Sequence, residues 1–228
     1  MNDVNINRDL KIKSMKNFNS GMYMEIFEWN QYERYVVVER DDVVLDLGCS
    51  MGYFYFKNSE LGIDYIGVDG SVDHLKDFID NLNSGGDDVK LINSVILGNK
   101  GIVEFPSMFN DMKYRTVMSM TFGDLIRLIG RKIDFMKFDI EGYESHIFSD
   151  NLDVFKKHVR KFSGEFHFSN VAYGVVSKEV SMNILISSKN DKDLDFRLFS
   201  LDGVDITEYF WINPNYYNEI IISGYVKQ

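Results

Sequence analysis

The stretch Val43-Val44-Leu45-Asp46-Leu47-Gly48-Cys49-Ser50-Met51-Gly52-Tyr53-Phe54 decides the fold class of this chain. Its apolar first half predicts a buried strand that ends at an acid and a glycine turn. Gly48 and Gly52 lack a Cβ atom, so the backbone there can turn sharply and lie close to a ligand. The residues after Gly52 are apolar again and predict a helix. A strand, a glycine turn and a helix in this order predict a ligand site at the carboxyl end of a strand in a doubly wound α/β sheet.

The spacing of the glycines narrows the kind of ligand. A dinucleotide site requires Gly-x-Gly-x-x-Gly, but Ser50 occupies the middle position here and no third glycine follows in phase. This pattern resembles motif I of the class I S-adenosylmethionine (SAM) methyltransferases, and a plain buried strand and turn is the alternative. The resemblance implies that Asp46 contacts the ammonium group of SAM through charge-assisted hydrogen bonds. The residues that it places against SAM are Asp46, Gly48, Ser50, Gly52, Tyr53 and Phe54.

A second acid closes a second predicted strand. The run Tyr65-Ile66-Gly67-Val68-Asp69 is apolar and ends in an acid about 20 residues after the first turn, where doubly wound folds use an acid to accept hydrogen bonds from ribose hydroxyls. Gly70 and Ser71 follow and complete the expected ribose end of the site. The alternative role of Asp69 is helix capping, although Ser71 or Asp73 can cap the next helix without it.

Composition limits the class of protein. A length of 228 residues with 45% hydrophobic and 14% aromatic residues fits one α/β domain with a substantial core. The single cysteine, Cys49, excludes an internal disulfide framework and favours a reducing, cytoplasmic compartment. No apolar run reaches the roughly 18 residues of a membrane span, and the N-terminus lacks a signal-peptide pattern. A net charge of −10 opposes binding to nucleic acid or to an anionic membrane.

Residues 1–40 are expected to form an N-terminal helical arm, and residues 41–228 the SAM-dependent methyltransferase domain. Within the arm, aromatic and aliphatic residues of the segment 22–40 recur at near-helical spacing and predict one or two helices. Such a stripe usually packs into the core. A role as a lid over the substrate is the alternative.

Local patterns predict the elements that follow. Residues 75–82 have helical apolar spacing, and residues 89–92 predict the third strand. Asn93 and Ser94 end that strand and are expected to contact the adenine edge, with a turn role as the alternative for Asn93. Further strands are predicted at 102–105, 133–139, 163–168, 196–200 and 219–226, further helices at 121–129, 152–159 and 177–188, and an irregular loop at 106–118.

The stretch 133–142, Ile-Asp-Phe-Met-Lys-Phe-Asp-Ile-Glu-Gly, resembles the I-D-x-x-K-x-D-x-E-G signature of the FkbM-type methyltransferases. Three further segments resemble signatures of the same family, in the same order along the chain. Residues 46–54 resemble its motif I, and residues 93–105 resemble its N-x-A-L…G-x-x-x-F stretch, with Val95 where Ala is common. Residues 165–167 resemble its E-x-H. The resemblance covers roughly residues 41–170. It implies a Rossmann-like, mostly parallel, seven-stranded sheet with an antiparallel C-terminal hairpin. It also implies O-methyl transfer from SAM, most often to sugar or polyketide hydroxyls.

Methyl transfer to a hydroxyl needs an oriented base, because the acceptor is a weak nucleophile near pH 7. His167 is the predicted base, as a neutral imidazole at the end of the fifth core strand, and a structural role is the alternative. Asp139 and Glu141 are the other catalytic candidates, with Asp139 expected to orient the methyl end of SAM or the acceptor hydroxyl. The remaining histidines fall on predicted helices and are expected at the surface: His74, His146 and His158.

A divalent metal ion is a second way to activate the hydroxyl. Asp139, Glu141, Glu165 and His167 offer mainly oxygen ligands, which suit Mg²⁺ or Mn²⁺, and some sugar O-methyltransferases use acids that follow strands in this way. The spacing does not identify a metal site by itself, so the sequence assigns no metal ligand.

The sequence thus favours a SAM-dependent O-methyltransferase acting on a sugar or glycan hydroxyl. The alternatives are methylation of a lipid, a small metabolite or a nucleic-acid ribose, and a non-catalytic SAM-binding module. The acidic composition disfavours nucleic acid. The identity of the acceptor, the oligomeric state and a cooperating glycosyltransferase are open.

Overall fold

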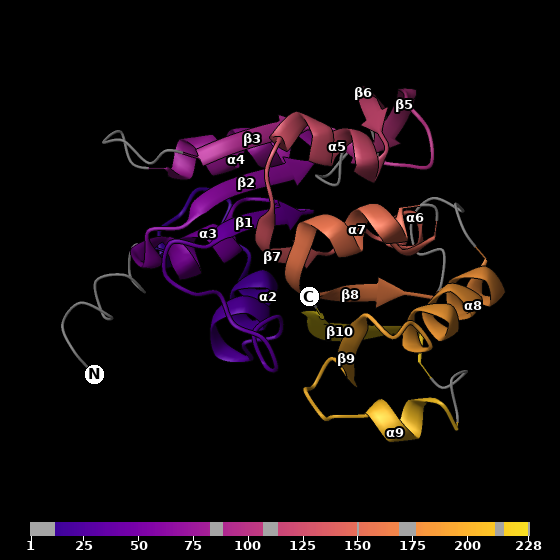
Figure 1. Cartoon of the computed structure of the whole chain (residues 1–228). Helices are drawn as coiled ribbons and strands as arrows, with labels where there is room; N and C mark the ends of the chain where they lie inside the picture. Colours follow the sequence, from indigo (N-terminus) through magenta and orange to yellow (C-terminus); the bar gives the residue numbers. More distant parts are fainter. Residues whose placement is uncertain are drawn as a thin grey trace.

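The computed structural model describes residues 12–82, 89–106, 114–149, 151–168, 177–212 and 217–227. Its central sheet contains β1 (Val43–Leu47), β2 (Asp64–Asp69), β3 (Val89–Asn93), β7 (Ile133–Phe138), β8 (Val159–His167), β9 (Leu194–Phe199) and β10 (Glu219–Val226). The seven strands lie in the order β3-β2-β1-β7-β8-β10-β9 (Figure 1). The strands from β3 to β8 are parallel, and β10 is antiparallel to both β8 and β9. The predicted mostly parallel sheet with an antiparallel C-terminal hairpin is confirmed.

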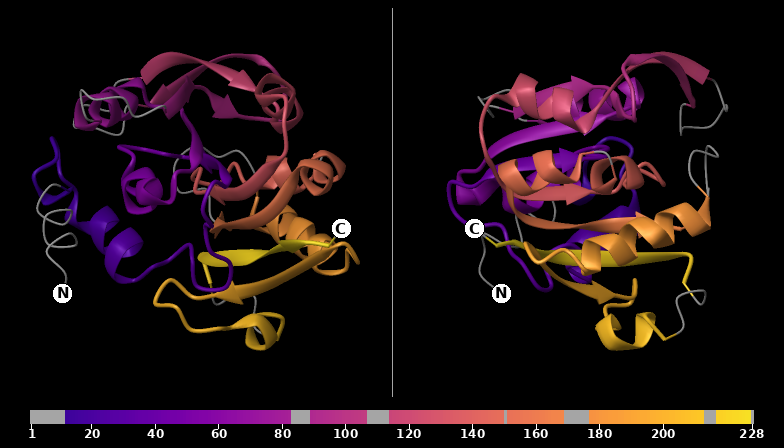
Figure 2. Two further views of the ribbon diagram at one scale, coloured as in Figure 1. Left: turned by 60° about the vertical axis from the view of Figure 1, so that its left-hand side comes forward. Right: turned by 45° about the vertical axis from the view of Figure 1, so that its right-hand side comes forward.

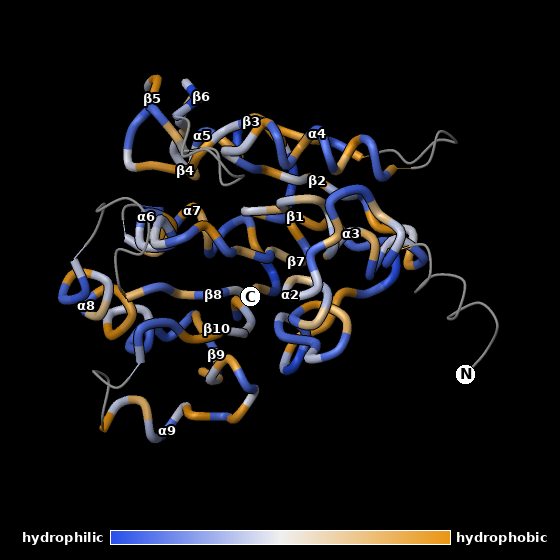
Figure 3. The backbone as a smooth tube through the Cα atoms, turned by 180° about the vertical axis from the view of Figure 1, so that it is seen from behind, coloured by the Kyte–Doolittle hydropathy of each residue, from blue (hydrophilic) through white to orange (hydrophobic). Residues whose placement is uncertain are grey.

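Helices cover both faces of this sheet (Figure 2). They are α2 (Ser20–Tyr23), the π-helix η1 (Met24–Glu28), α3 (Tyr53–Asn58), the 3₁₀-helix η2 (Ser59–Leu61), α4 (Val72–Asn81), α5 (Phe122–Ile129), α6 (Ser145–Phe148), α7 (Leu152–His158), α8 (Lys178–Lys189) and α9 (Thr207–Phe210). Successive strand side chains point to opposite faces. Leu45 and Leu47 therefore pack with the helices α5, α6, α7 and α8 in one core. Val44 points to the other face and packs with α3, α4 and the arm in a second core. Along α4 and α8, hydrophilic and hydrophobic segments alternate, as expected for helices with one buried side (Figure 3).

The N-terminal arm is less helical than predicted. Between residues 20 and 40 its helical part is α2 followed by η1, which ends at Glu28, and the described residues from 29 to 40 contain turns and bends but no helix or strand. Asn30 has a φ of +52°, a left-handed conformation that an α-helix cannot continue through. Residues 1–11 of the predicted arm lie outside the described residues. The division at residue 40 stays a prediction.

A second, three-stranded sheet contains β4 (Val95–Ile96), β6 (Tyr114–Met120) and β5 (Gly101–Pro106), in that order. The predicted hairpin strand at 102–105 is present as β5, which pairs antiparallel with β6. The predicted loop at 106–118 is wrong in its last part, because β6 begins at Tyr114. Only Val117 and Ser119 of β6 are buried, so the strand lacks the apolar alternation that would have predicted it. Residues 107–113 lie outside the described part of the chain.

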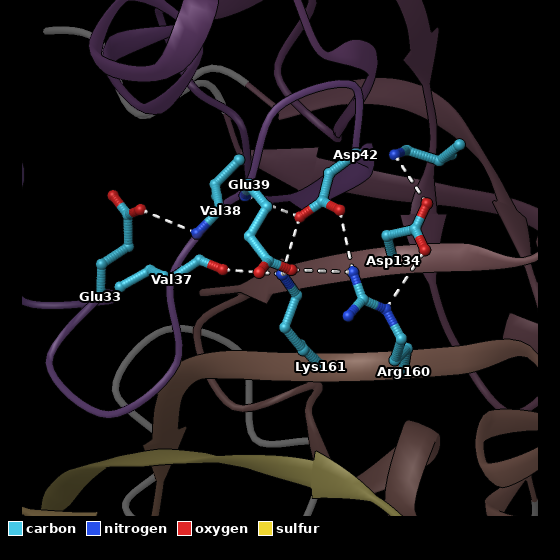
Figure 4. A network of polar contacts seen from close by, with 9 residues as sticks. Glu33, Val37, Val38, Glu39, Asp42, Asp134, Arg160 and Lys161 are labelled. Atoms are coloured by element: carbon cyan, nitrogen blue, oxygen red, sulfur yellow. Dashed lines mark hydrogen bonds and ion pairs between the residues drawn. The ribbon is translucent and has the colours of Figure 1, made fainter. Parts of the chain in front are cut away.

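A network of charged groups joins the arm to the amino ends of the strands (Figure 4). Lys161 on β8 is 3% exposed and contacts Glu39 at 2.7 Å and Asp42 at 2.8 Å. Its neighbour Arg160 contacts Asp42 at 2.9 Å and Asp134 at 3.3 Å. The network lies at the amino ends of the strands. Ligand sites in doubly wound sheets form at the carboxyl ends, which are at the opposite edge of the sheet.

Candidate active site

One cavity of about 440 Å³ lies at the carboxyl ends of the parallel strands. Its walls come from the segments that follow β1, β2, β3 and β7, from the end of β8, and from the N-terminal arm. A volume of this size suits a small-molecule ligand. The predicted cofactor contacts that line it are Asp46, Gly48, Ser50, Phe54, Asp69, Gly70, Ser71, Ser94 and Asp139.

Gly48 allows the ends of β1 and β7 to meet. Its φ is +75°, and a Cβ atom at this position would lie 1.8 Å from the carbonyl oxygen of Asp139. The Asp139 N–H donates a hydrogen bond to the carbonyl of Leu47 at 2.9 Å, which fixes the approach of the two strand ends. The glycine is therefore required by neighbouring backbone as well as by its place on the cavity wall.

Gly52 and Tyr53 line no part of this cavity. Gly52 precedes α3 with a φ of +86°, and a Cβ atom there would lie 2.3 Å from the Phe78 ring. The Tyr53 hydroxyl accepts a hydrogen bond from the Asn19 N–H at 2.7 Å. The structure thus gives both residues packing roles, because the second half of the glycine turn faces α4 and the arm.

Asn93 is exposed and also lies outside the cavity lining. Its amide donates hydrogen bonds to the carbonyls of Asp69 at 2.9 Å and Gly70 at 3.1 Å. These bonds give Asn93 the turn role that the sequence left as the alternative. Its neighbour Ser94 is buried and lines the cavity, and its hydroxyl donates to the Met118 carbonyl at 2.8 Å.

Asp69 ends β2 with its carboxylate held by two backbone N–H groups. The Ser50 N–H donates to Oδ2 at 2.9 Å, and the Ser71 N–H donates to Oδ1 at 2.7 Å. Each carboxylate oxygen has a second lone pair, so the group can still accept hydrogen bonds from a ligand. Ser71 caps α4 through its own hydroxyl, which accepts from the His74 N–H. Asp69 is consequently not needed as the helix cap.

His74 lies on the cavity wall, although the sequence predicts it at the surface. Its Nδ1 is 3.6 Å from Asp69 Oδ1 and 3.5 Å from Ser50 Oγ, and its side chain is 13% exposed. The surface prediction is wrong because the first turn of α4 faces the glycine turn. An imidazole beside Asp69 adds a polar group to this end of the cavity.

Asp46 is completely buried and already paired within the protein. Its carboxylate lies 3.1 Å from Lys137 Nζ and accepts a hydrogen bond from the Tyr65 hydroxyl. Lys137 also donates to the Gly48 carbonyl at 2.9 Å. Burial raises the pKa of Asp46, and the Lys137 charge opposes that rise. Burial would lower the pKa of Lys137, but Asp46 and Asp139 outweigh it and raise the pKa. Contact between Asp46 and a ligand ammonium group stays a prediction.

The N-terminal arm supplies one wall of the cavity, through Asn19, Met22, Glu25, Ile26 and Tyr32. This placement agrees with the alternative of a covering segment and also with core packing, because Ile26 and Tyr32 are buried. Burial and the nearby Asp139 raise the pKa of Glu25. The arm therefore brings an additional carboxyl group to the end of the cavity near β7.

A cluster of ligand-type atoms lies at that end. Asp139, which follows β7, and Glu165 and His167 on β8 each place one such atom within 4.8 Å of the others. His167 Nε2 lies 3.2 Å from Glu165 Oε2, and His167 Nδ1 lies 3.0 Å from Glu144 Oε1. Glu141 lines the cavity beside them, and its Oε2 is 4.0 Å from His167 Nε2. The structure thus brings together the three predicted catalytic residues.

The carboxylates determine the charge state of His167. Burial would lower the pKa of His167, but the charge and hydrogen bond of Glu144 and the hydrogen bond of Glu165 outweigh it and raise the pKa to about 12. The predicted neutral imidazole is therefore an imidazolium near pH 7 in this arrangement. Burial and the Asp139 charge raise the pKa of Glu141 and of Glu165.

Several site residues escaped the sequence reasoning. Lys137 stands two residues before Asp139 on one strand, and this period-2 spacing was an available signal that both face the same side. Glu144 follows the Glu-Gly pair closely and was a weaker signal. No signal in the sequence indicated Gln31 and Tyr32, because only the folded arm brings them to Glu165 and Asp139.

Comparisons with solved structures concern the fold. An rRNA methylase from Streptococcus thermophilus has a TM-score of 0.50 at 10% identity, with 100% of this chain and 98% of that chain covered. A fibrillarin–Nop5p complex has a TM-score of 0.50 at 12% identity, with 85% and 77% covered. An O-methyltransferase from Bacillus cereus in complex with SAH has a TM-score of 0.48 at 10% identity, with 97% and 88% covered. A search of curated protein sequences gave no match.

The sheet topology, with the cavity at its carboxyl edge, is that of the Rossmann-like fold of class I SAM-dependent methyltransferases. A sequence profile described as the methyltransferase FkbM domain matches residues 66–198, more than half of the chain. The chain belongs to the FkbM methyltransferase family. None of the helices within the described residues is long and apolar enough to cross a membrane.

Proposed function

We propose that this protein transfers the methyl group of SAM to a hydroxyl of a sugar or glycan. The observation that carries the proposal is one cavity that extends from Asp69 to the carboxyl groups beside β7. Asp69 offers fixed acceptors for ribose hydroxyls, and Asp139 and Glu141 offer acceptors for the hydroxyl groups of a second molecule. A methyltransferase that modifies a hydroxyl needs these two ends in one continuous space.

The cofactor end has features that fit SAM. The carboxylate of Asp69 keeps lone pairs for two neighbouring ribose hydroxyls, and the backbone of Gly70 and Ser71 lies beside it on the cavity wall. The buried Ser94 and the aromatic ring of Phe54 complete the lining. We assign SAM binding to Asp46, Gly48, Ser50, Phe54, Asp69, Gly70, Ser71, Ser94 and Asp139.

The acceptor end orients a hydroxyl and removes its proton. Bound SAM supplies a methyl group on a sulfonium with a good leaving group, so proximity and in-line geometry provide much of the rate. Asp139 and Glu141 line the cavity, and we assign them the orientation of the hydroxyl and the acceptance of its proton. His167 acts behind them as a cation that neutralises the carboxylates around it. A divalent ion, Mg²⁺ or Mn²⁺, is the alternative activator.

The lining of this end favours a polyhydroxylated acceptor. The carboxylates of Glu25, Asp139 and Glu141 accept several hydrogen bonds from hydroxyls. Tyr32 and Tyr143 also line the cavity, and aromatic side chains suit the apolar faces of a sugar. We also propose a cytoplasmic location, because the one cysteine is a buried free thiol.

Cofactor binding is tested by calorimetric titration with SAM and with S-adenosylhomocysteine. We expect one saturable site in the wild type and at least about 10-fold weaker binding in Asp69→Asn, because hydrogen bonds to a charged acceptor are lost. Asp64→Asn is the matched control. It lies at the amino end of the same strand and pairs with Lys90 and Arg131, away from the cavity. Equal affinity in both variants would remove the ribose role of Asp69.

The acceptor class is tested by incubating the protein with SAM and a panel of mono- and oligosaccharides, followed by mass spectrometry. We expect a sugar to gain one methyl group. Modification of lipids, small metabolites or ribose, with no sugar modified, would replace the acceptor assignment with one of those alternatives. Saturable SAM binding without transfer to any hydroxyl compound would support a non-catalytic SAM-binding module.

A further inference from the structure

We propose that Asp139, Glu165 and His167 form a site for one divalent metal ion, with Mn²⁺ preferred over Mg²⁺. The three side chains each offer one ligand atom, and these atoms lie within 4.8 Å of one another. Two carboxylates and one imidazole suit Mn²⁺ because imidazole binds first-row transition metals well, whereas Mg²⁺ prefers ligand sets made of oxygen. The inference rests on the proposed function only where it assigns the ion a role in methyl transfer.

The sheet explains why these three residues meet. Glu165 and His167 are two positions apart on β8, so their side chains leave the same face of the strand. The parallel pairing of β7 with β8 places Phe138 opposite Gly164, and Asp139 therefore emerges beside Glu165. His167 Nε2 and Glu165 Oε2 are 3.2 Å apart. Adjacent ligands of an octahedral ion with bonds of about 2.1 Å are separated by about 3 Å, which matches this spacing.

The imidazole is oriented by a buried acid, as is usual for metal-binding histidines. His167 Nδ1 lies 3.0 Å from Glu144 Oε1, and Glu144 is fully buried. The same carboxylate accepts hydrogen bonds from the N–H groups of Ile140 at 3.0 Å and Gly142 at 3.0 Å, so it is itself fixed. This arrangement directs Nε2 toward Glu165 and Asp139.

The two carboxylates are held from the N-terminal arm. The Tyr32 hydroxyl donates a hydrogen bond to Asp139 Oδ2 at 3.0 Å, and the Gln31 side-chain amide donates to Glu165 Oε1. Gln31 and Tyr32 are each 2% exposed. Each contact holds one carboxylate oxygen, and the second oxygen of Glu165, Oε2, is the one that faces His167 Nε2 at 3.2 Å. Every proposed ligand therefore has its own buried supporting group, drawn from the arm or from the segment before α6.

The charge around the cluster also favours a cation. Besides the proposed ligands, Glu141 Oε2 and Glu219 Oε2 lie 4.0 Å and 3.8 Å from His167 Nε2. The charge of the nearby Lys137 is already paired with the buried Asp46, so, among the described residues, the carboxylates of the cluster outnumber the cations beside them. A divalent ion at this position would offset the mutual repulsion of the carboxylates around it. Placed at the acceptor end, the ion would bind the acceptor hydroxyl and lower its pKa.

Metal binding is tested on the whole chain after treatment with a chelator, by calorimetric titration with MnCl₂ and by the electron paramagnetic resonance signal of free Mn²⁺. We expect one equivalent to bind without SAM, and a weaker response to MgCl₂. Glu165→Gln and His167→Gln should weaken Mn²⁺ binding by more than about 100-fold, and Gln31→Leu, which removes only a supporting contact, by about 10-fold. Asp193→Asn is the control, since Asp193 belongs to a separate acidic group that pairs with Lys156.

Absence of saturable Mn²⁺ binding to the wild type would overturn the inference even if the ligand variants do not fold. Equal binding in the wild type and in the folded Glu165→Gln and His167→Gln variants would also overturn it, as adventitious surface binding. Methyl transfer that persists in chelator, without Mn²⁺ binding, refutes the metal site and leaves the proposed function standing. Mn²⁺ binding at these residues without methyl transfer to any hydroxyl confirms the site and refutes the proposed function.

Discussion

At the scale of single residues, Gly48 makes the most demanding contact of the site. Its left-handed φ of +75° and the Asp139 carbonyl oxygen, 1.8 Å from where a Cβ would lie, both oppose any side chain. We expect Gly48→Ala to lower the free energy of unfolding by about 2–4 kcal/mol, because the end of β7 must move in addition to the backbone strain. Urea unfolding measures the change.

Gly130 provides the matched control for this substitution. It has nearly the same φ, +73°, but among the described residues no neighbouring atom lies within 4 Å of where a Cβ would be, so Gly130→Ala tests the backbone strain alone. We expect a loss of about 1–2 kcal/mol there. Equal losses in the two variants would show that the contact with Asp139 is relieved without cost.

At the scale of elements, the charged network in Figure 4 ties the arm to β8. Lys161 is 3% exposed and also donates to the Val37 carbonyl at 2.8 Å, whereas the Arg160 side chain is 40% exposed. We expect Lys161→Met to cost about 3–5 kcal/mol, because it leaves the buried Asp42 without its buried partner. Arg160→Met should cost less than about 1 kcal/mol.

The comparison of these adjacent residues separates burial from charge, since both contact Glu39 and Asp42. Urea unfolding of the two variants side by side is the measurement. Similar losses would mean that burial does not set the cost, and that the exposed arginine holds the arm as strongly as the buried lysine. Because the arm also supplies Gln31 and Tyr32, a loosened arm should in addition weaken ligand binding at the opposite edge of the sheet.

At the scale of the whole molecule, net charge separates the acceptor classes. The chain carries −10, and Glu25, Asp139, Glu141 and Glu165 line the cavity. We expect no binding of a single-stranded or structured RNA at about 10 μM protein and 0.15 M salt, because phosphate repels this surface. Fluorescence anisotropy with a labelled RNA tests this. Saturable binding that weakens steeply with salt would favour the ribose alternative, despite the net charge.

The sequence predicted most of the sheet because its buried strands are short apolar runs. The acids Asp46, Asp69 and Asp139 stand at or just beyond the ends of such runs, so their place at the carboxyl edge followed from strand length alone. The strand β6 was missed because only Val117 and Ser119 are buried, and Ser119 is polar, so the sequence shows no apolar alternation there. The helical segment predicted in the arm was too long, because the spacing of aromatic residues does not reveal a residue with left-handed backbone such as Asn30.

The sequence by itself determined the fold class, the position of Asp69 at the carboxyl edge of the sheet and the grouping of Asp139, Glu141 and His167, because the ends of parallel strands meet at one edge and side chains alternate with a period of two. Only the tertiary structure decided which partner each charge has. Lys137 pairs with Asp46, Glu144 orients His167, and Gln31 and Tyr32 reach the cluster from the arm. Charge states depend on burial and on neighbours distant in sequence, and those neighbours come together only when the chain packs.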